Sequence, residues 1–161
     1  MPAKVGDRIP DVEVRVLDAE GAPQPVKTGE LLGSGTVVLF AVPGAYTPGC
    51  SKVHLPGYVE NFDALKAKGV DTVACIAVND AWVMGAWGEA QGAAGKIVMI
   101  GDGSGDFAEA MGLVMDGTAF GLGKRSQRYS AIIKDGVITS LDVEEGPGVS
   151  VSGCDVMLGK V

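Results

Sequence analysis

The sequence predicts an α/β protein whose mixed central sheet is flanked by helices. Three apolar runs of strand length are separated by segments with helical periodicity, and these runs are residues 36–42, 72–78 and 96–100. Two further strand patterns, 127–134 and 137–143, meet at Lys134-Asp135-Gly136, a turn signal for an antiparallel hairpin. Strands that alternate with helices and close in a hairpin favour helical layers packed on one mixed sheet.

The N-terminal part of the chain begins with a strand that has one solvent-facing side. Apolar and charged residues alternate over residues 12–16, which is the period of a strand. Residues 18–25, which contain Gly21 and two prolines, are expected to form a loop. Residues 28–33 predict one short helical turn before the buried strand 36–42.

A helix is expected over residues 55–70. Val59, Phe62 and Leu65 are three residues apart and define its apolar face. Pro56-Gly57 lies inside this span and is expected to kink the helix or to split it after a short first segment.

Side-chain patterns also predict where two later helices begin. Asp80 is a candidate N-cap for a helix over residues 81–91. Asp106 and Glu109 have the spacing of a capping box for a helix that ends near residue 112.

Composition and charge argue against several kinds of partner. The chain has 161 residues, 47% of them apolar and 20% charged, which fits one globular domain over residues 1–161. A formal net charge of −7 argues against binding to nucleic acid. Because no apolar run approaches the ~20 residues of a membrane helix, no membrane association is expected.

The N-terminus and the cysteines indicate a compartment. The first residues lack the charged and apolar regions of a signal peptide. The three cysteines are an odd number without a Cys-x-x-Cys pair, unlike a secreted disulfide scaffold. We therefore expect a reducing, cytoplasmic setting. Metal ligands are too few for a closed site, so no metal is expected.

The stretch Pro43-Gly44-Ala45-Tyr46-Thr47-Pro48-Gly49-Cys50 carries the strongest functional signal. It joins the buried strand 36–42 to a helix start, with prolines and glycines in the turn between them. A cysteine at a helix N-terminus meets unpaired N–H groups and the positive end of the helix dipole, so its thiol is expected to ionise more easily. Thr47 lies three residues earlier, close enough to place a hydroxyl beside the sulfur.

These residues match a known pattern. Pro43, Thr47 and Cys50 have the spacing Pro-x-x-x-Thr-x-x-Cys, and residues 42–58 resemble the active-site loop of the type II, or peroxiredoxin five-like, peroxiredoxins. The similarity extends from residue 5 to residue 136. It implies a thioredoxin-like fold with an N-terminal extension and no cofactor. It also implies a thiol peroxidase, acting in antioxidant defence, that reduces hydrogen peroxide and alkyl hydroperoxides as the Cys50 thiolate becomes a sulfenic acid.

Peroxide reduction also needs a positive charge near the developing anions, and arginine keeps its charge better than lysine. The chain has four arginines, which are Arg8, Arg15, Arg125 and Arg128. The type II pattern places its catalytic arginine just before an aromatic residue at a strand start. This selects Arg128, which precedes Tyr129, and leaves Arg125 as the weaker candidate.

Other parts of the loop are expected to support this chemistry. Backbone N–H groups at Gly49 and Cys50 would hold the bound oxygens, and Pro43 would shield the sulfur from bulk water. The resemblance further implies that the helix start unwinds locally to expose Cys50, which a weak first turn at Pro56-Gly57 would favour.

The sequence leaves open which thiol reduces the sulfenic acid. Cys75 lies in the middle of an apolar strand and is expected to be a core side chain. Cys154 lies in a last expected helix, 152–158, after the turn Gly146-Pro147-Gly148, and is a candidate resolving cysteine. It is offset by about a helical turn from the resolving cysteine of some animal type II members. Glutathione with glutaredoxin is therefore the expected reductant, and a thioredoxin-dependent route through Cys154 is the alternative.

Other interpretations concern His54, the function class and assembly. A cysteine hydrolase would carry its histidine on a separate element with a third orienting residue, so His54 is expected to be a helix or interface residue that assists locally. A redox-responsive binding or holdase module is the alternative function class. The resemblance implies a homodimer, and we expect its contact around Tyr46, Trp82 and residues 120–125.

Overall fold

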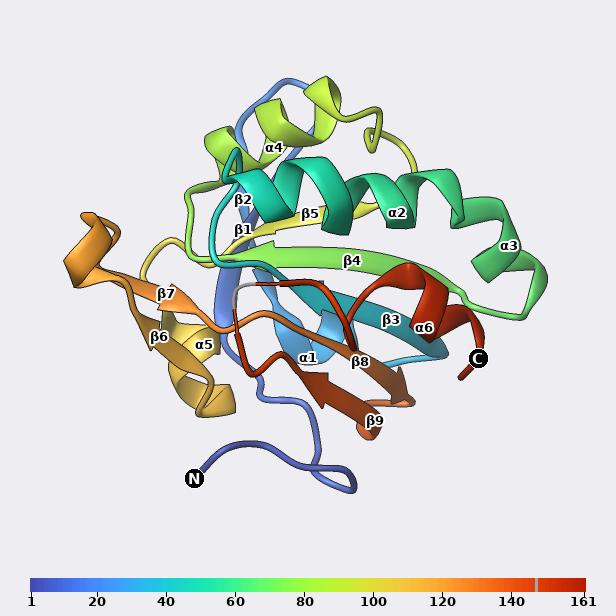
Figure 1. Cartoon of the computed structure of the whole chain (residues 1–161). Coiled ribbons are helices and arrows are strands. Elements are labelled where there is room, and N and C mark those ends of the chain that lie inside the picture. Colours follow the sequence, from blue (N-terminus) through green and yellow to red (C-terminus); the bar gives the residue numbers. More distant parts are fainter. Residues whose placement is uncertain (147) are drawn as a thin grey trace.

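A seven-stranded mixed sheet forms the centre of the computed structural model, which describes residues 1–146 and 148–161 (Figure 1). Its strands are β1 (Glu13–Leu17), β2 (Pro23–Lys27), β3 (Thr36–Ala41), β4 (Thr72–Ala77), β5 (Val98–Gly101), β8 (Tyr129–Lys134) and β9 (Val137–Val143). Their order is β2-β1-β5-β4-β3-β8-β9. Strands β3, β4 and β5 are parallel, and the other neighbours are antiparallel. The predicted mixed α/β sheet is confirmed, with strand ends within about two residues of those expected.

Helices cover both faces of the sheet (Figure 1). They are α1 (Thr28–Leu31), α2 (Leu55–Glu60), α3 (Phe62–Ala67), α4 (Ala81–Ala90), α5 (Asp106–Met111) and α6 (Cys154–Leu158). One core cluster joins α2, α3, α4 and α6 to the sheet, and the other joins α5 to the opposite face. None of these described helices is long and apolar enough to span a bilayer.

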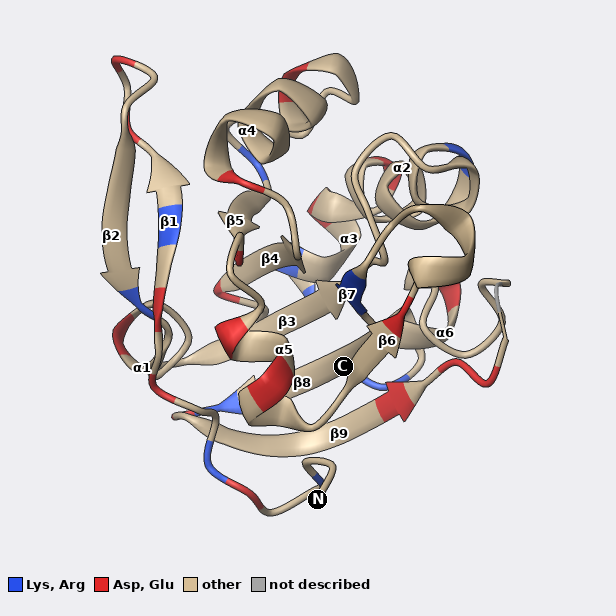
Figure 2. Ribbon diagram, turned by 90° about the vertical axis from the view of Figure 1, so that its left-hand side faces the viewer, with Lys and Arg blue, Asp and Glu red and all other residues tan. Residues whose placement is uncertain are grey.

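The central strands are apolar because both of their faces are covered. In β3, Val38 and Phe40 pack in the cluster beneath α2, whereas Val37 and Leu39 pack in the other cluster. Strands β3 and β4 carry no charged residue, and the charged residues lie on the elements around them (Figure 2). This is the pattern of parallel strands buried on both sides.

The segment expected to be a loop over residues 18–25 is partly a strand, so that prediction was wrong. Strand β2 pairs antiparallel with β1, with Leu17 opposite Pro23 and Arg15 opposite Pro25. Proline lacks the N–H that a central strand must donate, but β2 is the outermost strand and has a neighbour on one side only. The edge position therefore tolerates both prolines.

The expected capping box at Asp106 and Glu109 was also wrong. The residue before α5 is Gly105 in a left-handed conformation (φ 77°), and it makes no side-chain cap. Asp102 takes over this role, because its carboxylate accepts hydrogen bonds from the N–H groups of Phe107 and Ala108 at 3.0 Å each. By contrast, the predicted cap of α4 is confirmed: the Asp80 carboxylate accepts from the Val83 N–H at 2.8 Å.

The C-terminal part contains one feature that sequence patterns did not indicate. Two three-residue strands, β6 (Val114–Asp116) and β7 (Lys124–Ser126), form a separate hairpin joined through the 3-10 turn η2 (Thr118–Phe120). The hairpin turn between β8 and β9 is as predicted, with positive φ at Asp135 (49°) and Gly136 (83°). Pro147, in the turn expected before the last helix, lies outside the described residues.

Candidate active site

The Pro43–Cys50 loop follows the carboxyl end of β3 and is held by a hydrogen bond to the segment after the neighbouring strand. The Ala45 N–H donates to Oδ1 of Asn79 at 2.9 Å, and Asn79 follows the neighbouring strand β4. Tyr46 adopts a left-handed conformation (φ 67°) that a non-glycine residue rarely takes. The chain thereby reverses direction, and the next helical segment begins at Pro48, two residues before Cys50.

This segment opens with an α-helical hydrogen bond from the Ser51 N–H to the Thr47 carbonyl at 2.9 Å and continues as the π-helical turn η1 (Cys50–His54). In an α-helix, the ring of Pro56 would clash with the carbonyl of Lys52, four residues earlier. The turn is wider instead: the Leu55 N–H donates to the Cys50 carbonyl, five residues back. The helix is therefore not split at Pro56-Gly57: α2 continues through both residues, and the helical span is interrupted only at Asn61.

Cys50 and Thr47 are in direct contact. The Cys50 side chain is fully buried, and its Sγ lies 2.8 Å from Oγ1 of Thr47. Oγ1 of Thr47 also lies 2.7 Å from the Gly44 carbonyl oxygen, which can only accept. Because a hydroxyl has one proton, Oγ1 can donate to the Gly44 carbonyl and still offer lone pairs on the side of the sulfur.

Arg128 reaches the same sulfur from a distant part of the sequence. It immediately precedes β8, and β8 pairs with β3 so that Tyr129 lies opposite Ala41, near the start of the Cys50 loop. Nη2 of Arg128 lies 3.2 Å from Sγ of Cys50. Arg128 is only 6% exposed, and its Nε–H has no hydrogen-bond partner within the described part of the chain.

His54 orients this arginine. Its Nδ1 lies 2.9 Å from Nη1 of Arg128, and its Nε2 lies 3.0 Å from the Ser152 carbonyl oxygen. Burial first, and the Arg128 charge second, lower the pKa of His54 from 6.5 to about 4, so the ring is neutral at pH 7. Since the guanidinium can only donate and the carbonyl can only accept, the ring proton is on Nε2. His54 is thus a buried helix residue that assists locally.

Arg125, the weaker candidate, holds backbone rather than sulfur. Its Nε–H donates to the Leu122 carbonyl at 3.1 Å, and its Nη1 donates to the Pro43 carbonyl at 3.3 Å. It therefore ties the β6–β7 hairpin to the first residue of the active-site loop. A Cβ atom at Gly44 would lie 2.7 Å from Nη1 of Arg125 and 3.2 Å from Cγ2 of Thr47, so a larger residue here would displace the Arg125 guanidinium.

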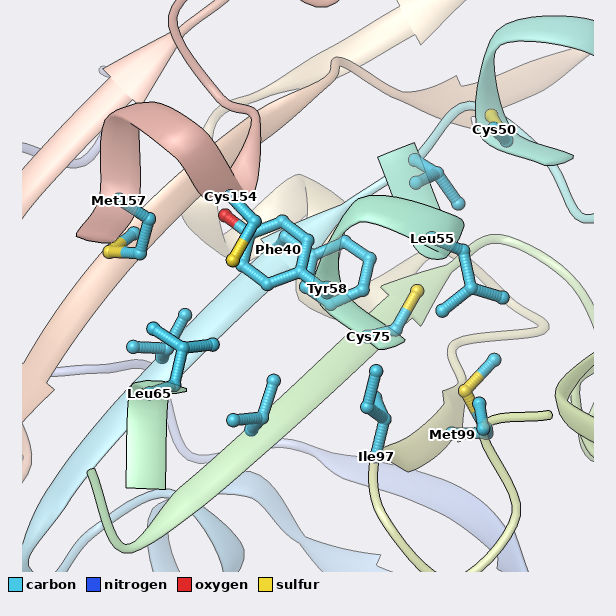
Figure 3. Close-up of a cluster of buried hydrophobic side chains, with 14 of the residues drawn as sticks. Phe40, Cys50, Leu55, Tyr58, Leu65, Cys75, Ile97, Met99, Cys154 and Met157 are labelled. Atoms are coloured by element: carbon cyan, nitrogen blue, oxygen red, sulfur yellow. The ribbon is translucent and has the colours of Figure 1, made fainter. Parts of the chain in front are cut away.

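The other two cysteines are core side chains (Figure 3). Cys75 is fully buried on β4, as predicted, and burial raises the pKa of its thiol well above the ordinary value. Cys154 is 3% exposed, and burial followed by the Asp155 charge raises its pKa to about 12. In Figure 3 its sulfur points toward Leu65 and away from Cys50.

A cavity of about 820 Å³ opens beside the buried sulfur. Thr47 and Arg128 are among its lining residues, so the cavity reaches the two side chains that contact Sγ. Pro43, Gly49 and the apolar residues Val114, Met115, Phe120 and Leu122 line it as well, together with the polar residues Gln127, Glu144 and Glu145. Among the described residues, no group of three or more histidine, cysteine or acidic side chains could hold a metal ion.

A buried thiol between a hydroxyl and a guanidinium, at the end of a cavity, is the arrangement expected for peroxide reduction, and comparison with known proteins decides the family. The sequence matches the Redoxin family over residues 4–158. It is 39% identical over 157 residues to peroxiredoxin-2B of Arabidopsis thaliana, covering 98% of this chain and 97% of that protein. The chain belongs to the peroxiredoxin family.

Other relatives agree with this assignment. Chloroplastic peroxiredoxin-2E-2 of Oryza sativa subsp. japonica is 44% identical over 158 residues, which cover 96% of this chain and 70% of that protein. The crystal structure of reduced Prx3 from Vibrio vulnificus, in complex with hydrogen peroxide, has a TM-score of 0.93 and 47% identity, with 98% of each chain covered. The predicted resemblance to type II peroxiredoxins and the thioredoxin-like fold are confirmed, and the protein is a thiol peroxidase.

Sequence patterns did not indicate two parts of this peroxiredoxin site. Glu144, directly after β9, accepts hydrogen bonds from Ser150, Val151 and Ser152, and the Ser152 carbonyl in turn holds His54. The only available signal was an acidic residue at a strand end, which by itself indicates a solvated turn. Asn79, which holds the loop at Ala45, was likewise expected only as the end of a strand.

Proposed function

We propose that this peroxiredoxin reduces hydrogen peroxide and alkyl hydroperoxides through Cys50, with Thr47 and Arg128 as its catalytic partners. The observation that supports this is the position of Sγ of Cys50, 2.8 Å from Oγ1 of Thr47 and 3.2 Å from Nη2 of Arg128. The thiolate attacks one peroxide oxygen, the O–O bond breaks, and the second oxygen leaves as water or alcohol after taking up a proton. Sulfur is oxidised by two electrons to a sulfenic acid.

Each neighbouring group has a distinct task. The Arg128 guanidinium stabilises negative charge on sulfur and on the leaving oxygen, and its unpartnered Nε–H is available to a bound oxygen. Thr47 Oγ1, which donates to the Gly44 carbonyl, accepts the hydroxyl proton of the peroxide and fixes its orientation. Backbone N–H groups at Gly49 and Cys50 hold the same oxygens, and Pro43 limits access of water.

For the reducing half of the cycle we propose glutathione with glutaredoxin. A resolving thiol must reach the sulfenic acid as a thiolate, and the Cys154 thiol is buried with a pKa raised to about 12. These properties favour an external thiol over Cys154, and a thioredoxin-dependent route through Cys154 is the alternative. Either route requires η1 to unwind, because Cys50 is fully buried.

We also propose that the enzyme is a cytoplasmic homodimer. Two exposed apolar side chains belong to the site's own elements: Phe120, which lines the cavity, is 84% exposed, and Tyr46, in the Pro43–Cys50 loop, is 56% exposed. Trp82, at the start of α4, is 60% exposed as well. Contact between two copies over these side chains would remove them from water.

Two measurements test the proposed function. Peroxide consumption with a glutaredoxin system should be lost in Cys50→Ser and retained in Cys154→Ser. Full activity of Cys50→Ser would refute the mechanism, and a protein that suppresses aggregation without consuming peroxide would be a holdase instead. Mass spectrometry after one equivalent of peroxide, with and without glutathione, should detect a glutathione adduct on Cys50. An internal Cys50–Cys154 disulfide would select the thioredoxin route.

A further inference from the structure

Glu144 is a buried carboxylate that the reaction as described so far does not use. It directly follows β9 and is 8% exposed, and within residues 1–146 and 148–161 no lysine or arginine forms an ion pair with it. Instead its oxygens accept five hydrogen bonds from the segment Ser150–Ser152. The donors are the N–H groups of Ser150, Val151 and Ser152 at 2.8 Å each and the hydroxyls of Ser150 at 2.8 Å and Ser152 at 2.7 Å.

This arrangement is an anion nest built from the chain's own backbone. Burial by itself would raise the pKa of Glu144, but the hydrogen bonds from Ser152 and Ser150 outweigh it and lower the pKa to about 2. The charged carboxylate therefore fixes three consecutive residues. Hydrogen bonds to a charged acceptor are stronger than neutral ones, so the segment is held firmly.

The fixed segment points one carbonyl at the peroxidatic helix. The Ser152 carbonyl oxygen accepts from the Tyr58 hydroxyl at 2.9 Å and from Nε2–H of His54 at 3.0 Å. Ser152 is fully buried, and its N–H and hydroxyl are both bound to Glu144. Its carbonyl direction is thus set by Glu144.

The same contacts continue to the sulfur. Because the Ser152 carbonyl keeps the proton on Nε2 of His54, Nδ1 is an acceptor for Nη1 of Arg128. The guanidinium is planar, so holding Nη1 also directs Nη2, which contacts Cys50. Glu144 also holds the backbone of Arg128, because the backbone N–H of Glu144 donates to the Arg128 carbonyl at 2.9 Å.

We propose that Glu144 is a positioning residue for the peroxidase reaction, acting on Cys50 through Ser152, His54 and Arg128. This inference rests on the proposed function. With the carboxylate in place, the guanidinium faces the sulfur. Without it, the 150–152 segment loses its anchor, the His54 tautomer is no longer fixed, and Arg128 can turn away from Cys50.

The test uses Glu144→Gln in the full-length protein, because glutamine keeps the size and an acceptor oxygen but removes the negative charge that strengthens the hydrogen bonds from residues 150–152. The second-order rate constant of Cys50 oxidation by hydrogen peroxide should fall about tenfold. The pH profile of this rate should move to higher pH, because the Arg128 guanidinium, whose positive charge stabilises the thiolate, is displaced from Cys50. Glu60→Gln, the same change at an exposed carboxylate on α2, should leave both unchanged.

A double-mutant cycle separates positioning from general destabilisation. If Glu144 acts through His54, then Glu144→Gln in a His54→Ala background should cost less than about twofold. His54→Gln should retain most of the rate, because its amide can replace both ring contacts. An equal loss in both backgrounds, or no loss in either, would overturn the proposal.

Two further controls keep the test decisive. Circular dichroism verifies folding, and should Glu144→Gln not fold, Ser152→Ala removes one donor to Glu144 and keeps the carbonyl. Its rate should fall about threefold, again only when His54 is present, and an unchanged rate would overturn the proposal. If wild-type Cys50 is not oxidised at all, the proposed function fails. If it is oxidised and the variants match it, only the role of Glu144 fails.

Discussion

The guanidinium of Arg128 donates to Nδ1 of His54 at 2.9 Å, which requires a neutral imidazole with its proton on Nε2. Two residues that are 74 positions apart in the sequence thus orient each other beside Cys50. His54 lies in the segment that carries the nucleophile, and Arg128 immediately precedes β8. Unwinding of η1 would therefore remove the nucleophile and the orienting partner of the arginine together.

Arg128→Lys should slow Cys50 oxidation about 100-fold. Lysine keeps the positive charge, but a single ammonium group cannot reproduce the planar pair of contacts to His54 and Cys50. Stopped-flow measurement of peroxide reaction under single-turnover conditions gives the rate. Arg15→Lys, at an exposed position on β1, is the matched control. A wild-type rate in Arg128→Lys would show that charge alone is sufficient.

Acid should destabilise the fold through His54. Its pKa is about 4 in the folded state, lowered first by burial and then by Arg128, against 6.5 as the ordinary value. Between these pH values the unfolded chain binds more protons, so stability is present above pH 6.5 and is lost as the pH falls toward 4. The complete loss is on the order of 3 kcal/mol. Urea denaturation at several pH values measures it.

The control for this prediction is His54→Gln, whose amide does not titrate. Its free energy of unfolding should decline less steeply than that of the wild type over the same pH range. Glu144, with a pKa of about 2, stays ionised there and contributes equally to both proteins. Identical slopes for the two proteins would contradict the assigned protonation state of His54.

Gly44→Ala should impair the site by moving Arg125. Gly44 does not have a positive φ, so the backbone accepts alanine, but the new Cβ would lie 2.7 Å from Nη1 of Arg125 and, less tightly, 3.2 Å from Cγ2 of Thr47. The peroxide rate should fall about tenfold as the Pro43 carbonyl loses its partner. At Gly148 a Cβ would meet no atom within 4 Å, so Gly148→Ala is the control. Gly44→Ala should add little to Arg125→Ala, and additive losses would disprove this coupling.

Cys154→Ser should keep glutaredoxin-dependent turnover close to that of the wild type. The Cys154 thiol is buried, and its raised pKa of about 12 leaves very little thiolate at neutral pH. Turnover of peroxide by the variant with glutathione and glutaredoxin is the measurement. Complete loss of activity in a folded variant would identify Cys154 as the resolving cysteine.

Trp87 should report the unwinding of η1. Its indole Nε1–H donates to Oγ of Ser51 at 2.9 Å, next to the nucleophile, and the side chain is fully buried. In a Trp82→Phe background, which removes the exposed indole, oxidation of Cys50 should change the Trp87 fluorescence and added glutathione should restore it. Cys50→Ser should show no change. Formation of the glutathione adduct without any change at Trp87 would argue against local unwinding.

The sequence by itself determined the parts of this protein that depend on local spacing. The alternation of buried strands and helices fixes an α/β fold, because strands such as β3 are apolar on both faces and need helices on both sides. Pro43, Thr47 and Cys50 lie within one turn, so their proximity follows from the chain itself. Arg128 could be chosen only with the help of the family resemblance.

Other local predictions failed where the tertiary context outweighed the pattern. Pro23 and Pro25 indicate a loop until the edge position of β2 is known. Asp106 and Glu109 have the spacing of a capping box, but α5 is capped instead by the Asp102 carboxylate, which follows β5 and accepts from the N–H groups of Phe107 and Ala108. Spacing predicts which groups can meet, and only the packed structure decides which of them do.

The tertiary structure alone decided how the site is held together. Antiparallel pairing of β3 with β8 brings Arg128 to Cys50, and the return of the chain after β9 brings Glu144 and Ser152 to His54. These contacts join residues up to 98 positions apart, and no periodicity records them. A histidine four residues after a cysteine could have served many roles. Its contacts with Arg128, just before β8, and with the Ser152 carbonyl make His54 the residue that orients this arginine.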